Sequence, residues 1–343
     1  MANPYVFIVG CPRSGTTLLQ RMADAHPLLA VTNESEWFDK RWILRWFDKR
    51  RGLTPEGFVT PELISLMVEH PKFSRLKVGQ EELLGLLETS QPVSYPEFLT
   101  RVLDRYGRRA GKALVGNKTP IFVRRLYTLH KLWPQTRFVH LIRDGRDVCL
   151  SVVPWPKGPI VKGKVVTSKD APVSTVALWW ELSVRLGREA GNSLGSELYY
   201  EMRYESLVSN PAKECAALCA FLDLPYDEAM LRFHEGRTKS DPGLSAKHAW
   251  RPVTPGLRDW RSQMPAEDVE RFEAAVGELL DELGYQRAVP YPRPESLEEA
   301  ARVRGLLARD AHWMGVVKRA CTDRPEPGLR VSESQTRSAS VGS

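Results

Sequence analysis

Short apolar runs recur along the chain, and each ends in glycine or polar residues. Residues 5–9 and 137–142 are the clearest of these runs, residues 113–118 form a brief strand-like segment that ends in a lysine, and residues 197–204 are also strand-like. Runs of this length, bounded by turn-forming or charged residues, are typical of strands that are buried on both faces of a parallel sheet. We therefore predict four strands in these places.

Longer segments with helical spacing alternate with the strands. The first helix follows residue 17 and ends near His26 and Pro27, because the residue before a proline disfavours the helical conformation. Further helices are predicted over residues 121–133, 174–189, 211–222, 265–283 and 297–318. Strands that alternate with helices predict an α/β fold, a parallel sheet flanked by helices.

The remaining segments define the expected domain organisation. Residues 37–112 are rich in tryptophan, leucine and paired charges, which predicts a helical insertion after the first strand and helix. Residues 153–172 lack periodicity and predict a mobile loop. We expect a main domain over residues 1–290, a C-terminal helical extension over 291–320 and a disordered tail over 321–343.

The loop after the first strand has the features of an anion-binding turn. Gly10 and Gly15 have the G-x-x-x-x-G spacing of a nucleoside-triphosphate P-loop, with a strand before the loop and a helix after it. This geometry points backbone N–H groups and a helix N-terminus at a phosphate-like group. Thr16 replaces the P-loop lysine, however, and Arg13 supplies a positive charge from within the loop. The loop is therefore P-loop-like but lacks the main cation of a nucleotide triphosphatase.

Two more basic residues stand at the ends of predicted strands. Lys118 ends the strand at 113–118, and Arg143 directly follows the strand at 137–142. Ligands of open α/β sheets bind at the carboxyl ends of the strands. We therefore expect Arg13, Lys118 and Arg143 to converge on one anionic ligand.

Composition narrows the class of protein. The chain has 343 residues, of which 42% are hydrophobic and 27% charged, and a net charge of +7, which suits an anionic cosubstrate. No zinc-finger or RNA-recognition pattern is present, so we expect no nucleic-acid partner. No apolar run approaches the ~20 residues of a membrane span. The first strand begins by residue 5 and leaves no room for a leader, so we expect a cytoplasmic location.

Six ordered segments of the sequence resemble one family. They are RSGTTLLQRMADAHP, the Asn33-Glu34 pair, VGNKTP, FVHLIRDGRDVCLSV, RYESLVSNP with FLDLP, and RPVTPGLRDW through ELGY. Together they resemble the sulfotransferases that use 3′-phosphoadenylyl sulfate (PAPS), above all the tyrosylprotein branch and its bacterial relatives. The resemblance covers residues 5–286 and implies that the main domain is a sulfotransferase domain with PAPS as its cosubstrate.

The resemblance implies a role for each matching residue. The segment Arg13, Ser14, Gly15, Thr16 and Thr17 would hold the 5′-phosphosulfate. The 3′-phosphate would be held by Arg143 and Ser151. Tyr204 would line the nucleotide site, and Arg251 would close over the phosphates, with Ser245 nearby in the same site. Trp155 stands where the tyrosylprotein branch has a further phosphate-binding arginine.

Sulfuryl transfer to a hydroxyl needs a base for the acceptor proton and cations that stabilise the developing charge. Glu34 lies where the resemblance places the catalytic glutamate, and Arg13 and Lys118 would be the catalytic cations. Glu36 is a competing base two residues further on. His140 is another candidate, because cytosolic sulfotransferases use a histidine, but its position within a strand favours a core role. We expect no metal, because no metal-ligand motif is visible.

Other functions and the acceptor stay open at this point. A P-loop small-molecule kinase and a non-catalytic nucleotide-binding module are the alternatives to a sulfotransferase. We expect a small hydroxylated acceptor (a metabolite, lipid or glycoside) rather than a protein tyrosine. Two absences support this expectation: no peptide groove is marked in the sequence, and the secretory anchor of the tyrosylprotein branch is missing. The sequence does not define the oligomeric state, and a homodimer is one possibility.

Overall fold

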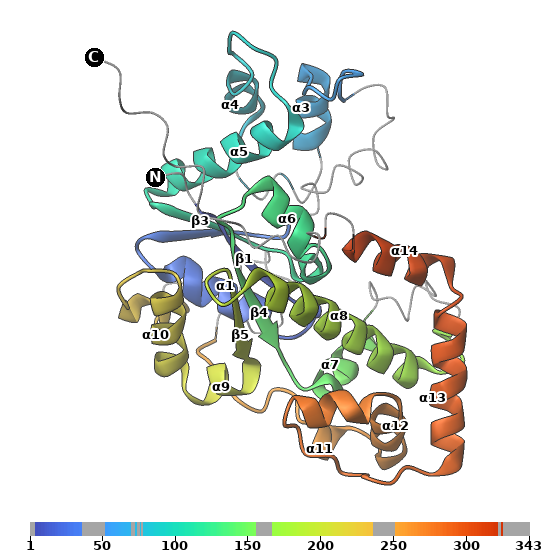
Figure 1. Cartoon of the computed structure of the whole chain (residues 1–343). Helices are drawn as coiled ribbons and strands as arrows, with labels where there is room; N and C mark the ends of the chain where they lie inside the picture. Colours follow the sequence, from blue (N-terminus) through green and yellow to red (C-terminus); the bar gives the residue numbers. More distant parts are fainter. Residues whose placement is uncertain are drawn as a thin grey trace.

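One sheet of five parallel strands forms the centre of the molecule (Figure 1). The computed structural model describes residues 4–35, 52–69, 73, 76, 78–155, 167–235, 251–321 and 324. The strand order is β2-β3-β1-β4-β5, and each neighbouring pair is parallel. The strands are β1 (Val6–Gly10), β2 (Leu29–Thr32), β3 (Leu114–Lys118), β4 (Arg137–Ile142) and β5 (Tyr199–Arg203). The predicted α/β fold is confirmed.

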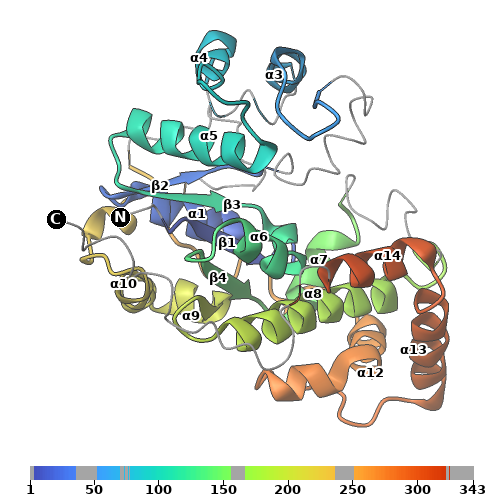
Figure 2. The ribbon, with the colours of Figure 1, turned by 45° about the horizontal axis from the view of Figure 1, so that its top comes forward.

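Helices cover both faces of the sheet, because the inner strands are apolar on both sides. In β1, Phe7 and Val9 pack into a core formed with α5 (Tyr95–Ala110) and α6 (Leu126–Leu132). Val6 and Ile8 point to the opposite face, toward α1 (Thr16–Ala25) and α10 (Pro211–Phe221). Figure 2 shows the same layering, with α5 above the sheet and α1 below it.

A third core lies beyond the end of β4. It joins α7 (Gly145–Val152) and α8 (Pro172–Leu194) to α12 (Ala266–Glu282) and α13 (Pro294–Leu307). The remaining helices and turns are α3 (Pro61–Val68), α4 (Gln80–Gly85), η3 (Pro120–Arg124), α9 (Tyr204–Ser209), η4 (Glu228–Met230), α11 (Trp260–Gln263) and α14 (Ala311–Ala320). No described helix is both long enough and apolar enough to cross a membrane.

The chain order places the ligand-binding edge between β1 and β4. From β1 the chain continues to β2 and β3 on one side of the sheet, then crosses to β4 and β5 on the other side. Ligands of open parallel sheets bind outside the carboxyl ends of strands at such a reversal. The loop after β1 and Arg143 after β4 both stand there.

Three elements differ from the sequence-based prediction. Strand β2 was not predicted, because it has only four residues and begins two residues after Pro27. The helix expected over 121–133 is a 3₁₀ turn, η3, followed by α6, with Arg125 outside the helical conformation between them. The last helix is divided into α13 and α14, and Asp310 caps the N-terminus of α14 by accepting from Trp313 N. The domain boundaries stay a prediction, and most of the 153–172 loop and of the tail lies outside the described residues.

Candidate active site

The loop between β1 and α1 has the backbone of an anion site. Gly15 is the N-cap of α1 in the left-handed conformation, with a φ of 93°, and offers no side chain to cap the helix. The N–H of Leu18 bonds back to the Gly15 carbonyl at 2.9 Å, and the first-turn N–H groups before it have no acceptor one turn earlier in the helix, so they can donate to a ligand. Arg13 also has a positive φ, 79°, a conformation that costs a non-glycine residue of order 1–3 kcal/mol. The loop therefore holds Arg13 in a strained backbone position at the helix N-terminus.

Tyr204 closes one side of this loop. A Cβ on Gly15 would lie 2.4 Å from the Tyr204 ring, so a side chain there would displace the ring. The guanidinium of Arg143 lies over the other part of the same ring, with its Cζ 4.2 Å from the centroid. Tyr204 thus packs between the glycine loop and Arg143, and brings the ends of β1 and β4 into one site.

The groups expected at the two phosphate ends of the nucleotide lie in direct contact. Nε of Arg13 donates a 2.8 Å hydrogen bond to Oγ of Ser151, on α7. The Arg13 guanidinium also lies over the Trp155 ring, 5.5 Å from its centroid. Trp155, which replaces an arginine of the tyrosylprotein branch, therefore packs on the loop arginine in this structure.

Lys118 connects the loop to Glu34. Its Nζ lies 3.0 Å from Oε1 of Glu34 and 3.3 Å from Oγ1 of Thr17, in the first turn of α1. Lys118 is buried, whereas the Glu34 side chain is 28% exposed. The carboxylate is thus reachable from solvent while the ammonium group holds it beside the loop.

The backbone on both sides of Glu34 is fixed by β3, a feature that the sequence analysis missed. The buried Nδ2 of Asn117 donates to the carbonyl oxygen of Asn33 at 3.0 Å and to Oγ of Ser35 at 2.6 Å. The N–H of Ser35 donates to Oγ1 of Thr119 at 2.8 Å. Asn117 and Thr119 flank Lys118 in the segment VGNKTP, so their position beside a predicted site residue was the available signal.

A further arginine contributes to the electrostatics of the site. The pKa of Arg13 is lowered from its usual value, first by burial and then by the charge of Arg258, while Glu34 opposes the shift and Arg143 adds to it. Arg258 precedes α11 and was not predicted. The site has a surplus of positive charge around Arg13, as an anionic ligand requires.

The structure does not bring every predicted residue into contact. Ser245 and the competing base Glu36 lie outside the described residues. Arg251 is exposed. His140 is fully buried, its Nδ1 lies 2.6 Å from the Tyr199 hydroxyl, and burial lowers its pKa to about 3. Ser14 and Thr16 are buried in the loop, and Oγ of Ser14 has no hydrogen-bond partner among the described residues.

Comparison with known proteins gives a consistent picture. The chain is 26% identical over 299 residues to the protein-tyrosine sulfotransferase of Drosophila melanogaster, and the matched region covers 85% of this chain and 53% of that protein. It is also 26% identical to protein-tyrosine sulfotransferase A of Caenorhabditis elegans, over 91% of this chain and 75% of that protein. The chain thus spans about half the length of the fly relative. In fold it resembles the sulfotransferase domain of the Synechococcus PCC 7002 olefin synthase (TM-score 0.56, 22% identity, 83% of this chain and 95% of that chain).

These relatives correct two expectations. The prediction of a small hydroxylated acceptor in preference to a protein tyrosine is wrong, because the curated relatives are protein-tyrosine sulfotransferases. That prediction relied on the lack of a peptide-groove signal, but a groove depends on surface shape and leaves no motif. The prediction of a cytoplasmic location is wrong on the same finding, because it relied on a missing leader and the curated relatives are protein-tyrosine sulfotransferases. The absence of a visible leader does not determine where a protein resides.

Family membership follows from the match to a family model. Residues 4–228, more than half of the chain, match the model of the family described as "Sulfotransferase family". The match includes the glycine loop, Glu34, Lys118, Arg143, Ser151 and Tyr204, and it confirms the resemblance found in the sequence. The chain is a member of the sulfotransferase family, whose enzymes take the sulfuryl group from PAPS.

Proposed function

We propose that this protein transfers the sulfuryl group of PAPS to the phenolic hydroxyl of a tyrosine in a protein or peptide. The main support is the contact between Arg13 and Ser151, beside Arg143, because it joins the groups expected at the two phosphate ends of one nucleotide. The Glu34–Lys118 pair lies next to the same loop through Thr17. The names of the curated relatives support tyrosine as the acceptor.

In the proposed reaction Glu34 accepts the proton of the tyrosine hydroxyl, and the phenolic oxygen bonds to sulfur. The bond from sulfur to the bridging phosphate oxygen breaks, and adenosine 3′,5′-bisphosphate leaves with the electron pair. Arg13 and Lys118 stabilise the negative charge that develops on the sulfuryl and bridging oxygens. Positioning and electrostatics dominate here, as in phosphoryl transfer.

The ion pair gives Lys118 a second task. A carboxylate must be ionised to accept a proton, and an ammonium group 3.0 Å away favours the ionised form. Once the proton has moved to Glu34, its attraction for Lys118 weakens. The ammonium group can then interact more strongly with the negative charge of the leaving phosphate, without any large movement of the chain.

Binding tests the nucleotide part of the proposal. In calorimetry, adenosine 3′,5′-bisphosphate should bind without Mg²⁺, and ATP with Mg²⁺ should not replace it. A preference for ATP with Mg²⁺ contradicts the proposal and favours the kinase alternative. Binding without any sulfate transfer favours the non-catalytic module.

Transfer tests the acceptor and the base. Labelled PAPS should label a peptide with one tyrosine, and the same peptide with phenylalanine there should stay unlabelled. Glu34→Gln should lower kcat by about 10²–10⁴-fold, the usual contribution of general base catalysis. Its affinity for adenosine 3′,5′-bisphosphate should stay close to that of the wild type. A Glu34→Gln enzyme with the wild-type rate removes Glu34 from this role.

A further inference from the structure

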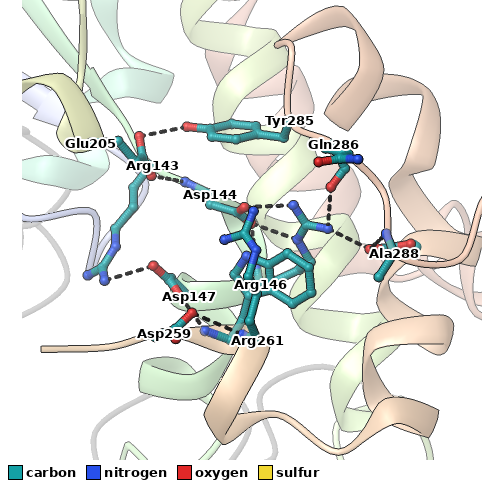
Figure 3. Close-up of polar contacts among 12 residues, drawn as sticks. Arg143, Asp144, Arg146, Asp147, Glu205, Asp259, Arg261, Tyr285, Gln286 and Ala288 are labelled. Atoms are coloured by element: carbon teal, nitrogen blue, oxygen red, sulfur yellow. Dashed lines mark hydrogen bonds and ion pairs between the residues drawn. The ribbon is translucent and has the colours of Figure 1, made fainter. Parts of the chain in front are cut away.

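The second half of the sequence R-D-G-R-D, residues 143–147, has no role in the proposed reaction, yet it is buried. Figure 3 shows the guanidinium of Arg143 beside Asp147, whereas Arg146 reaches toward Gln286, in the segment after α12. Asp147 lies in the first turn of α7 and is 9% exposed. A buried carboxylate in this position needs partners on both oxygens.

The two oxygens of Asp147 bind two different segments. Oδ2 accepts from Nη2 of Arg143 at 3.1 Å. Oδ1 accepts from the backbone N–H of Trp260 at 2.9 Å, across 113 residues of sequence. One carboxylate therefore connects the arginine after β4 to the first residue of α11.

Arg146 contacts the same residue, Trp260, through its side chain. Its guanidinium lies over the Trp260 ring, 3.7 Å from the centroid, and is fully buried. It also forms ion pairs with Asp144 and Glu273, the latter on α12. Trp260 is thus held at its backbone by Asp147 and at its ring by Arg146.

The segment that ends at Trp260 carries Arg258, whose charge acts on Arg13. Only one residue separates Arg258 from Trp260, so fixing the Trp260 backbone restricts where the Arg258 side chain can reach. Asp147 orients Arg143 directly and places Arg258 through Trp260. Arg143 also packs on Tyr204, beside the glycine loop, and the charges of Arg258 and Arg143 both lower the pKa of Arg13.

We propose that Asp147 is a positioning residue that holds Arg143 through one carboxylate oxygen and, through the other, anchors at Trp260 N the segment that carries Arg258. The proposal rests on the nucleotide site described under Proposed function. Asp147 does not contact the substrate in this scheme. The contribution of Arg258 to nucleotide binding therefore depends on the hydrogen bond of Asp147, in the helix after β4, with Trp260.

A double-mutant cycle tests this coupling, with adenosine 3′,5′-bisphosphate as the probe in calorimetry. Arg258→Gln should weaken binding about tenfold in the wild type, the usual loss for one charge-assisted hydrogen bond. The same change should cost less than about twofold in an Asp147→Ala background, where the Trp260 N–H has lost its acceptor. Asp147→Asn is the matched control, because its amide oxygen still accepts from Trp260 N, and there the tenfold loss should persist.

The outcomes separate this inference from the proposed function. If the wild type does not bind the nucleotide, the proposed site itself fails. If the wild type binds but Arg258→Gln costs as much in Asp147→Ala as in the wild type, or costs nothing in the wild type, only the coupling fails. Circular dichroism checks that each variant folds, and Asp147→Ser, also too short to reach Trp260 N, replaces Asp147→Ala if that variant does not. A Ser variant that keeps the full tenfold loss likewise overturns the proposal.

Discussion

At the scale of single residues, the site depends on a glycine that faces an aromatic ring. Gly15→Ala should lower the free energy of unfolding by more than the ~1–2 kcal/mol that a left-handed conformation costs an L-residue, because the new methyl group must also displace Tyr204. Nucleotide affinity should fall with it, since Tyr204 also packs on Arg143. Urea denaturation and calorimetry with adenosine 3′,5′-bisphosphate measure the two effects.

Gly111 offers the matched control for that change. It has a φ of 66° at the C-terminus of α5, and a Cβ there would meet no atom within 4 Å. Gly111→Ala should therefore show the conformational cost alone, with unchanged nucleotide affinity. If Gly15→Ala binds the nucleotide as the wild type does, the contact between Tyr204 and the loop has no part in binding.

At the scale of elements, the sequence was informative wherever a strand carried a motif at its end. Strands β1, β3 and β4, which end at or just before Gly10, Lys118 and Arg143, were predicted to within one residue at each end. Each strand is followed by a glycine or a charged residue that marks its end in the sequence. Contacts between distant segments could not be predicted in this way. Two examples are the hydrogen bond of Asp147 with Trp260 and that of Asn117 with the backbone beside Glu34. Both depend on three-dimensional packing, which hydrophobic periodicity does not encode.

The junction of α7 with α12 allows a prediction at the same scale. The Glu273 side chain is fully buried and accepts from Arg146 and from the N–H groups of Ala288 and Val289. Glu273→Gln should lower the free energy of unfolding by about 1–3 kcal/mol, because an amide keeps only one oxygen to accept from the three N–H donors and leaves at least one of them unsatisfied. Urea denaturation provides the measurement. Glu267→Gln, which alters an exposed pair with Arg271 on the same helix, should leave the stability nearly unchanged.

At the scale of the whole molecule, charge is distributed by function. The ligand edge of the sheet gathers Arg13, Lys118, Arg143 and Arg258, and burial combined with mutual repulsion lowers the pKa of Arg13. Behind it, the guanidinium of Arg146 lies between two carboxylates, those of Asp144 and Glu273. The arginines around Arg13 thus lie at the edge where a ligand with several phosphate charges would bind, whereas Arg146 behind them is paired with carboxylates.

The sheet interior also determines how stability depends on pH. His140 is fully buried, and its pKa is lowered from 6.5 to about 3, mainly by burial and further by Arg188 and Arg203. The folded protein therefore keeps His140 neutral while the unfolded chain takes up a proton below pH 6.5. Because the unfolded state binds the extra proton, stability is lost as the pH falls from 6.5 toward 3, by about 1.4 kcal/mol per pH unit from this group.

Comparing the wild type with His140→Gln isolates this contribution, because burial raises the pKa of Asp147 and Glu205 and gives those groups the opposite pH dependence. Urea denaturation at pH 7, 6 and 5 should show the advantage of the wild type over the variant shrinking below pH 6.5. His312→Gln, which changes an exposed histidine, controls for the altered charge. If the difference in stability between the wild type and His140→Gln stays constant from pH 7 to pH 5, His140 accepts a proton as readily in the folded protein as in the unfolded chain. That result contradicts a neutral, buried His140 paired with Tyr199 in the folded protein.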